Sequence, residues 1–298
     1  MIVVKIKGGL GNQLFQYAFA RAFQENRRDD KLILDVSGFE KDKQRNFSLS
    51  NFELSNKCDI EESNKYNARY DRLTNQFLRV ATKIMPRIAF KYLSRKGILV
   101  WDRIDYIEIP KIDNENVYIN GYWQSEKYFS SIKSQLKKEI ICPIKDVQLL
   151  EKIRNSNSVC VHIRRGDYLL PQNHLLVCTE KYYKAAINKI LENFHDAKFF
   201  VFSDDIDEVK RMNFFDKKLK EQVHFVENFH PDYEEIMLMS SCNHFIISNS
   251  SFSWWAQYLT NNANAVIVAP SIWYDDGRRT DIHLKNWLLL SPQGLEVK

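Results

Sequence analysis

The sequence predicts an α/β protein of two Rossmann-like domains that face each other across a cleft. In both halves of the chain, short β-branched runs alternate with segments of helical spacing, which is typical of parallel sheets covered by helices. The 298 residues suffice for two domains of ordinary size. A polar stretch at 145–158 indicates the approach to a boundary, so we expect domains at 1–150 and 151–298.

A β-α-β unit opens the first half. The apolar run 2–6 predicts a buried strand, the spacing of apolar residues over 14–23 predicts a helix, and 31–36 predicts a second strand. Because parallel strands end at one edge of a sheet, ligands are expected beyond their carboxyl ends.

The rest of the first half is less regular. Residues 60–100 carry charge, aromatic residues and helical spacing but no strand signal, so we interpret them as inserted helices. A strand is predicted at 117–123, and Ser125 is placed to cap a helix that begins at Glu126.

The second half repeats the alternation. The predicted elements are strands at 158–163, 198–203, 223–226, 244–247 and 265–269, and helices at 182–194, 232–241 and 252–259.

The composition excludes several classes of protein. Hydrophobic residues make up 44% and charged residues 27%, which fits neither a disordered nor a membrane-spanning chain. The net charge of +5 is too small to predict nucleic-acid binding, although it suits a phosphate-bearing ligand or an anionic membrane surface. Five cysteines without a CxxC pair, and no long apolar N-terminal segment, predict a cytoplasmic protein, with loose attachment to a membrane left open.

Glycines form the first turn. Gly8-Gly9-Leu10-Gly11 precedes Asn12 and the first predicted helix. Glycines let the backbone approach a phosphate, and the N-terminus of a helix favours its charge. Leu14 replaces the third glycine of a dinucleotide fingerprint, and no P-loop follows. A plain tight turn is the alternative interpretation.

A basic cluster follows the strand at 158–163. His162 and Arg164 share one face of that strand, and Arg165 lies where the chain leaves the sheet. Arginine keeps its charge and presents a fork of donors, so these side chains can bind a pyrophosphate without a metal. Asp167 can orient an arginine or accept a proton. A solvated charge cluster on a loop is the alternative.

Ser203, Asp204 and Asp205 follow the next strand. Carboxylates there can accept hydrogen bonds from ribose hydroxyls or from guanine. Adjacent acids also suit a metal ion, and a helix cap is a third interpretation.

Small hydroxyl residues open the helix after the strand at 244–247. Ser250, Ser251 and Phe252 lie at its start, where hydroxyl and N–H groups can bind a phosphate. A cap requires one serine, and the segment offers more polar residues than that.

Tyr122, Trp123 and Gln124 lie at the end of the strand predicted at 117–123, and Glu126 follows after Ser125. Aromatic faces with amide and carboxylate groups suit a sugar, although Trp123 can equally serve in packing. The other histidines show no metal-ligand spacing: His174, His195, His224, His230 and His283.

Together these segments resemble glycosyltransferase family 11, the α-1,2-fucosyltransferases of bacteria and animals. They run in the family's order over nearly the whole chain, whereas residues 60–115 resemble nothing in the family and are where acceptor preference is expected. The matching segments are GGLGNQLFQYA at 8–18, GYWQSEKYF at 121–129, HIRRGDY at 162–168, FSDD at 202–205 and SNSSFSWWA at 248–256.

The resemblance implies a GT-B fold whose second domain holds GDP-fucose and whose first domain contributes the acceptor side. The implied reaction moves L-fucose from GDP-β-L-fucose to the 2-hydroxyl of a galactoside by inversion, without a metal or other cofactor. The implied acceptor is a galactose-containing oligosaccharide or a lipid-linked glycan, in surface polysaccharide or O-antigen biosynthesis. The expected place is the cytoplasm, as the composition predicts, and peripheral association with the inner membrane is left open.

The same resemblance implies roles for single residues. Arg164 and Arg165 stabilise the departing diphosphate, because its leaving oxygen gains charge. His162 and an acid of the Ser203–Asp205 segment bind ribose or guanine. The remaining implied donor contacts are Gly11, Asn12, Ser250, Ser251 and Phe252.

Asp167 and Glu126 are the candidate general bases, and Tyr122, Trp123 and Gln124 are the candidate acceptor contacts. Three alternatives remain at this point: a GT-B transferase with a different donor, a metal-dependent transferase, and a non-catalytic module that binds glycans or RNA.

Overall fold

The structure, a computed structural model, shows two compact units. It describes residues 1–27, 30–40, 45–61, 66, 76–169, 175, 177–212, 214–215, 217–227 and 230–297. The first unit comprises 1–141 with 280–282, and the second comprises 142–279 with 283–298. The predicted boundary at 150–151 was therefore placed too late, because it cuts through a helix of the second unit.

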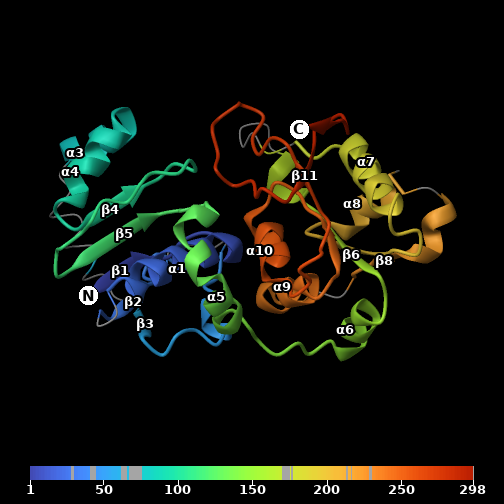
Figure 1. The fold of residues 1–298 in the computed structure, drawn as a ribbon, viewed down its shortest axis with the longest axis horizontal. Coiled ribbons are helices and arrows are strands. Elements are labelled where there is room, and N and C mark those ends of the chain that lie inside the picture. Colours follow the sequence, from blue (N-terminus) through green and yellow to red (C-terminus); the bar gives the residue numbers. More distant parts are fainter. Residues whose placement is uncertain are drawn as a thin grey trace. The chain divides into compact units, whose positions relative to one another are not determined.

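Parallel strands form the sheet of the first unit (Figure 1). They are β1 (Ile2–Lys5), β2 (Leu32–Asp35), β3 (Cys58–Glu61), β4 (Ile98–Trp101) and β5 (Val117–Gly121), in the order β3-β2-β1-β5-β4. The chain runs from β1 outward to β3, and later fills the other side with β4 and β5. The order therefore reverses between β1 and β5, and this switch point is where such sheets bind ligands.

The mostly buried helix α1 (Leu10–Glu25) packs against β1 and β2 of this sheet. The helices and 3-10 turns of the unit are α1 (Leu10–Glu25), α3 (Gln76–Ile84), α4 (Pro86–Ser94), α5 (Lys133–Glu139), η1 (Leu49–Asn51), η2 (Glu126–Tyr128) and η3 (Ser130–Ile132). Arg21 of α1 is 2% exposed and bonds Glu139 of α5 at 2.9 Å, and Tyr17 donates to the same carboxylate. This pairing satisfies a charge that would otherwise be buried alone.

The prediction for 60–100 was only partly right. The helices α3 and α4 are present, but β3 and β4 lie at the two ends of the segment. Four-residue apolar runs such as that of β4 cannot be told from helix by periodicity, which explains the error. Ser125 does cap the following turn, since its hydroxyl accepts from the Lys127 N–H, but the turn is 3-10 rather than α-helical.

The second unit has a larger sheet. Its strands are β6 (Ser158–Ile163), β7 (Lys198–Ser203), β8 (Val223–Phe225), β9 (His244–Ile246), β10 (Ile267–Pro270), β11 (Leu288–Leu290) and β12 (Glu296–Val297), in the order β12-β11-β10-β9-β6-β7-β8. Only β12 is antiparallel among the strands described. Successive connections run from β6 to β8 on one side and from β9 to β11 on the other, so the switch point lies between β6 and β9.

Helices flank this sheet too. They are α6 (Val147–Arg154), α7 (Glu180–Leu191), α8 (Ile206–Arg211), α9 (Asp232–Ser240) and α10 (Ser251–Leu259), with 3-10 turns η4 (Gly166–Leu169) and η6 (Lys217–Gln222). The predicted strands 158–163 and 198–203 are confirmed with the same bounds, whereas β11 and β12 were not predicted.

Among the described residues, no helix combines the length and the apolar character needed to span a bilayer.

Candidate active site

Three predicted motifs meet at the carboxyl edge of the second sheet. β6 pairs in parallel with β7, where Ile163 lies opposite Ser203, and on its other side with β9. The loops that begin at Arg164, Asp204 and Ile247 therefore leave the sheet side by side. The prediction that these segments come together is confirmed within this unit, and they gather at its switch point.

The two arginines share one carboxylate. Asp204 Oδ1 accepts the backbone N–H of Arg165 at 2.8 Å, and Oδ2 lies 3.3 Å from Nη1 of Arg164. The Arg164 guanidinium also lies 5.2 Å from the ring centre of Tyr168. Asp204 thus orients both residues, which makes it a positioning residue as the structure stands.

Arg165 has an unused donor. Its Nη2 lies 3.6 Å from Glu208, a weak contact, while its buried Nε has no hydrogen-bond partner in the part of the chain that the structure describes. A buried guanidinium donor without a partner is costly unless a ligand supplies an acceptor. The Arg165 side chain can therefore donate a hydrogen bond to a bound anion.

His162 is a buried connector. The residue is 2% exposed, its Nδ1 lies 2.9 Å from Ser248 Oγ, and its backbone carbonyl accepts from the Tyr183 hydroxyl. Burial, reinforced by the nearby charge of Arg164, lowers its pKa to about 3, so the ring stays neutral. His162 thus joins β6 to the loop after β9, which gives it a positioning role, and its contact with ribose or guanine stays a prediction.

Most hydroxyl and amide groups of the serine-rich segment bond within the protein. Ser250 caps α10 by accepting the Phe252 N–H, and Ser253 bonds back to the carbonyl of Ser248. The Asn249 amide donates to two backbone carbonyls. These internal bonds explain the surplus of polar residues, and they leave the half-buried Ser251 and Phe252 at the N-terminus of α10 as the candidate phosphate contacts.

The three residues of the acidic segment at the end of β7 make different contacts. Asp205 caps α8 by accepting the Glu208 N–H at 3.0 Å, which is the helix-cap interpretation. Ser203 accepts the N–H of Asp205 and so shapes the same turn. Of the three residues 203–205, Asp204 is the one that contacts Arg164 and Arg165.

Glu235 of α9 belongs to this site and was missed from the sequence. Burial raises the pKa of its carboxyl to about 7, with Arg164 acting against the shift and Asp232 and Asp204 adding to it. In the sequence, acids at 232–235 read as ordinary first-turn helix acids. No local signal distinguishes Glu235, because its environment comes from β6 and β7.

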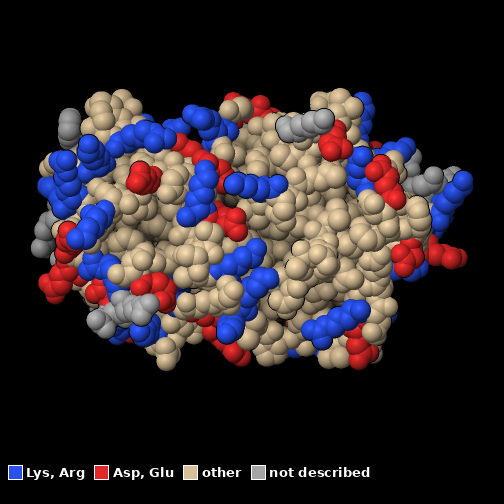
Figure 2. Space-filling model, viewed as in Figure 1, with Lys and Arg blue, Asp and Glu red and all other residues tan. Residues whose placement is uncertain are grey.

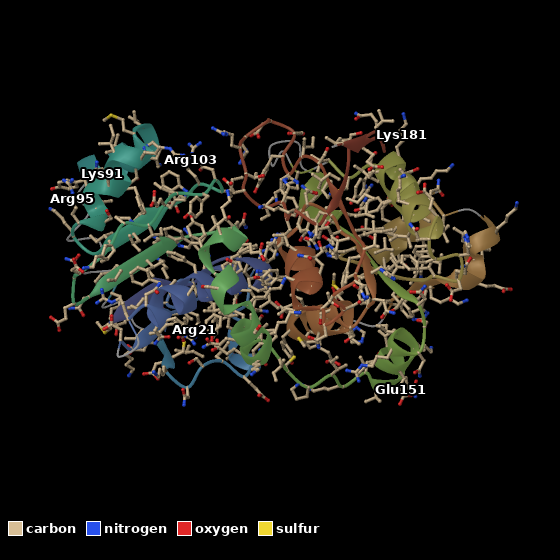
Figure 3. The ribbon with its side chains drawn as sticks, viewed as in Figure 1. Arg21, Lys91, Arg95, Arg103, Glu151 and Lys181 are labelled. Carbon is tan, nitrogen blue, oxygen red and sulfur yellow. The ribbon has the colours of Figure 1, made fainter. Side chains whose placement is uncertain are left out.

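We expect Glu235 to make stability depend on pH. A raised folded pKa means that the folded chain holds this proton more tightly, so the free energy of unfolding falls as pH rises from about 4.5 to about 7. Thermal unfolding at about pH 5 and about pH 8 should therefore show a smaller loss for Glu235→Gln than for the unchanged protein. Glu151→Gln, at an exposed position of α6, is the control (Figure 3). Equal pH dependence in all three proteins would contradict this expectation.

The first unit has its own cluster at the switch point between β1 and β5. Gly8, with φ of 81°, begins the turn after β1, and the half-buried Asn12 lies in the first turn of α1. The Gln124 amide donates to Asn12 Oδ1 at 2.7 Å, joining the loops after the two strands. Gly11, buried in the same turn of α1, presents no side chain.

Trp123 is a packing residue. Its indole is fully buried and stacks on Phe19 at 4.1 Å, and Tyr128 meets it edge-on. Its φ of 55° is rare for a bulky residue and turns the chain so that Gln124 reaches Asn12. The prediction that Trp123 offers a face to a sugar was wrong, whereas Tyr122 remains half-buried.

The candidate bases stay predictions. Glu126 is half-buried at the start of η2. Asp167 lies in η4, and its side chain falls outside the described part of the structure. Among described residues, His, Cys, Asp and Glu side chains do not gather in any group of three that could hold a metal ion.

The comparisons with known proteins agree with this geometry. The sequence profile of glycosyl transferase family 11 matches residues 1–291. The chain is 32% identical to an α-1,2-colitosyltransferase of Escherichia coli over 92% of its length and 93% of that protein's. It is 27% identical to the O-antigen biosynthesis glycosyltransferase WbnK of Escherichia coli, over 96% of this chain and 99% of that one.

A solved structure supports the fold. A mutant of Arabidopsis thaliana FUT1 in complex with GDP superposes with a TM-score of 0.52 at 11% identity, over 92% of this chain and 71% of that one. The predicted fold class, a GT-B protein with two Rossmann-like α/β units, is confirmed. On the full-length family match, the chain belongs to glycosyl transferase family 11.

Proposed function

We propose that this glycosyltransferase moves L-fucose from GDP-β-L-fucose to the 2-hydroxyl of a galactoside in one inverting displacement. The observation that carries the proposal is the pair Arg164–Arg165 at the switch point of the second unit, beside the N-terminus of α10. Both features favour a diphosphate, and both follow strands of one sheet.

The leaving group needs what these residues supply. As the bond to fucose breaks, negative charge grows on the β-phosphate while the sugar carbon becomes oxocarbenium-like. Preorganised arginines and helix N–H groups stabilise such charge without any rearrangement. The free Nε of Arg165, the guanidinium held by Asp204 and the opening turn of α10 are the proposed contacts.

Inversion requires the acceptor hydroxyl to attack from the face opposite GDP, which converts a β-linked donor into an α-linked product. A carboxylate can take the hydroxyl proton. Asp167 and Glu126 remain our candidates for this base. We also propose that the arginines make a metal ion unnecessary, so activity should persist in excess chelator.

The first unit offers a place for the acceptor. A groove of about 750 Å³ follows the second half of α1, walled by the segment 106–113 and by η2. Tyr106 and Tyr128 lie in it with ring centres 4.9 Å apart, and Lys127 and Glu108 add polar groups. Aromatic faces flanked by polar side chains suit a sugar chain. The lining segment 106–113 thus belongs to the region 60–115, in which the residues that set acceptor preference were expected.

A second donor has a specific observation in its favour. The relative at 32% identity is named for colitose, which differs from L-fucose only in lacking the 3-hydroxyl. A site that hydrogen-bonds this hydroxyl rejects the deoxy sugar by about 10⁴-fold, whereas a site that merely tolerates it discriminates weakly. Relative turnover of the two donors therefore decides between the assignments.

The test is a donor panel with a soluble galactoside acceptor. Release of the nucleoside diphosphate is measured with GDP-fucose, GDP-colitose, GDP-mannose and UDP-galactose, as GDP for the first three and UDP for the last. Each donor is tested with and without chelator, and the product linkage is determined by NMR. We expect turnover with GDP-fucose and an α-1,2 linkage. Preference for GDP-colitose would transfer the assignment to that sugar, and loss of activity in chelator would contradict the metal-free mechanism.

The acceptor class follows from the same comparisons. The names of the two Escherichia coli relatives point to O-antigen synthesis and to α-1,2 linkages. We therefore propose a galactose-containing glycan of a surface polysaccharide as the natural acceptor.

A further inference from the structure

The helices α3 and α4 present apolar side chains to solvent. Of the eleven large hydrophobic residues that are exposed in the described part of the chain, five lie between 80 and 92. Ile84 is 72% exposed and Ile88 is 67% exposed. Val80 and Ile84 lie four residues apart on α3, and Ile88 and Tyr92 lie four residues apart on α4, so each helix carries an exposed apolar pair on one face. This helix-pair surface consists of Val80, Ile84, Met85, Ile88 and Tyr92.

The exposed apolar pair of α4 is not on the face that packs against the sheet. Phe90 and Leu93 of α4 are buried, Leu93 clusters with β4, and Phe90 meets Trp101 edge-on at 5.7 Å. α4 therefore carries one apolar face for the core and another for solvent. The second face is open to solvent, and an exposed apolar patch of this kind marks an interaction surface.

Cations surround the helix-pair surface. Between 76 and 97 the sequence has no aspartate or glutamate. Figure 2 shows Lys and Arg side chains gathered over the part of the unit where Figure 1 places α3 and α4. Lys91 and Arg95 extend from α4 on the side away from β4 (Figure 3). The exposed cations are Lys83, Arg87, Lys91, Arg95 and Lys96.

We propose that the helix-pair surface docks on an anionic lipid bilayer. Its isoleucine and methionine side chains would enter the boundary between headgroups and acyl chains, and the flanking cations would meet lipid phosphates. The charges argue against a second copy of this chain, because a twofold interface would bring the same cations face to face. Docking of this kind is independent of the donor sugar and of catalysis.

The test is co-sedimentation of the full chain with lipid vesicles. We expect binding to phosphatidylcholine vesicles that contain about one third phosphatidylglycerol, little binding to phosphatidylcholine alone, and release by about 1 M NaCl. Two double variants should each lower the partition coefficient by at least about tenfold. They are Ile84→Ser with Ile88→Ser, and Lys91→Glu with Arg95→Glu.

A matched control separates local docking from net charge. Lys181→Glu with Lys184→Glu, on exposed positions of α7, changes the charge by the same amount and should leave binding within about twofold. Circular dichroism melts show that each variant folds. Equal loss in all charge variants, equal binding to neutral vesicles, or dimers that the isoleucine variants disrupt without any vesicle binding would each overturn the proposal.

Discussion

Arg165→Ala is expected to lower kcat for the proposed fucosyl transfer by about 10³-fold, with a smaller change in the KM for the donor. The Arg165 side chain is 17% exposed, and its Nε has no acceptor among the described residues, so the guanidinium is free to act when charge develops on the diphosphate. Its own backbone bond to Asp204 does not involve the side chain and should survive. The measurement is steady-state kinetics of GDP release.

Two further variants sharpen this test. Arg165→Lys keeps a charge but loses the planar fork, so it should recover only part of kcat. Arg211→Ala removes an arginine that also contacts Glu208, yet is 74% exposed at the end of α8, and should leave kcat unchanged. An Arg165→Ala enzyme with normal kcat would contradict the assigned role, whatever the KM.

Trp123→Ala is expected to destabilise the first unit by about 3–5 kcal/mol. The ring is fully buried between Phe19 and Tyr128, so its removal leaves a cavity and ends two aromatic contacts. The backbone would keep its unfavourable φ of 55° without the packing that imposes it. Thermal unfolding should show a midpoint lower by about 10 °C.

The control for this prediction retains a ring. Trp123→Phe keeps a stacking surface and removes an indole N–H that has no partner among the described residues, so its loss should be well below that of alanine. Tyr122→Ala, at a half-buried position, should change the melting point little. An unchanged melting point with a raised acceptor KM in Trp123→Ala would instead support a sugar platform.

Local sequence predicted the fold wherever a strand was long and bounded by clear signals. β6 and β7 each carry six residues that lead directly into charged loops, and both were predicted with their observed bounds. β1 and β2 are as short as β3 and β4, at four residues each, but only the first two adjoin the glycine turn and helix that indicate a β-α-β unit. β3, β4 and β12 depend on neighbours in the sheet that no local pattern reveals. The C-terminal limit of the first unit was missed because residues 142–150 pack with the second unit, which no local pattern reveals.

The site was predicted in outline and corrected in detail. Residue types at strand ends identified Arg164, Arg165 and Asp204, because parallel strands bring their carboxyl ends to one edge. Whether the other predicted side chains can contact a ligand depends on their burial, and burial depends on elements that are distant in the sequence. His162 and Trp123 were predicted as ligand contacts but lie at 2% and 0% exposure. Burial raises the pKa of Glu235, and that burial is not visible in the local sequence.

The discontinuous first unit limits how this enzyme can be recombined with its relatives. Asp281 accepts hydrogen bonds from the Tyr106 N–H and from Lys127, so a short piece near the C-terminus completes a unit that otherwise ends at residue 141. A chimera that exchanges only 1–141 would separate Tyr106 and Lys127, both beside the proposed acceptor groove, from the carboxylate that holds them. Exchanges of acceptor preference should therefore carry 280–282 together with the N-terminal part.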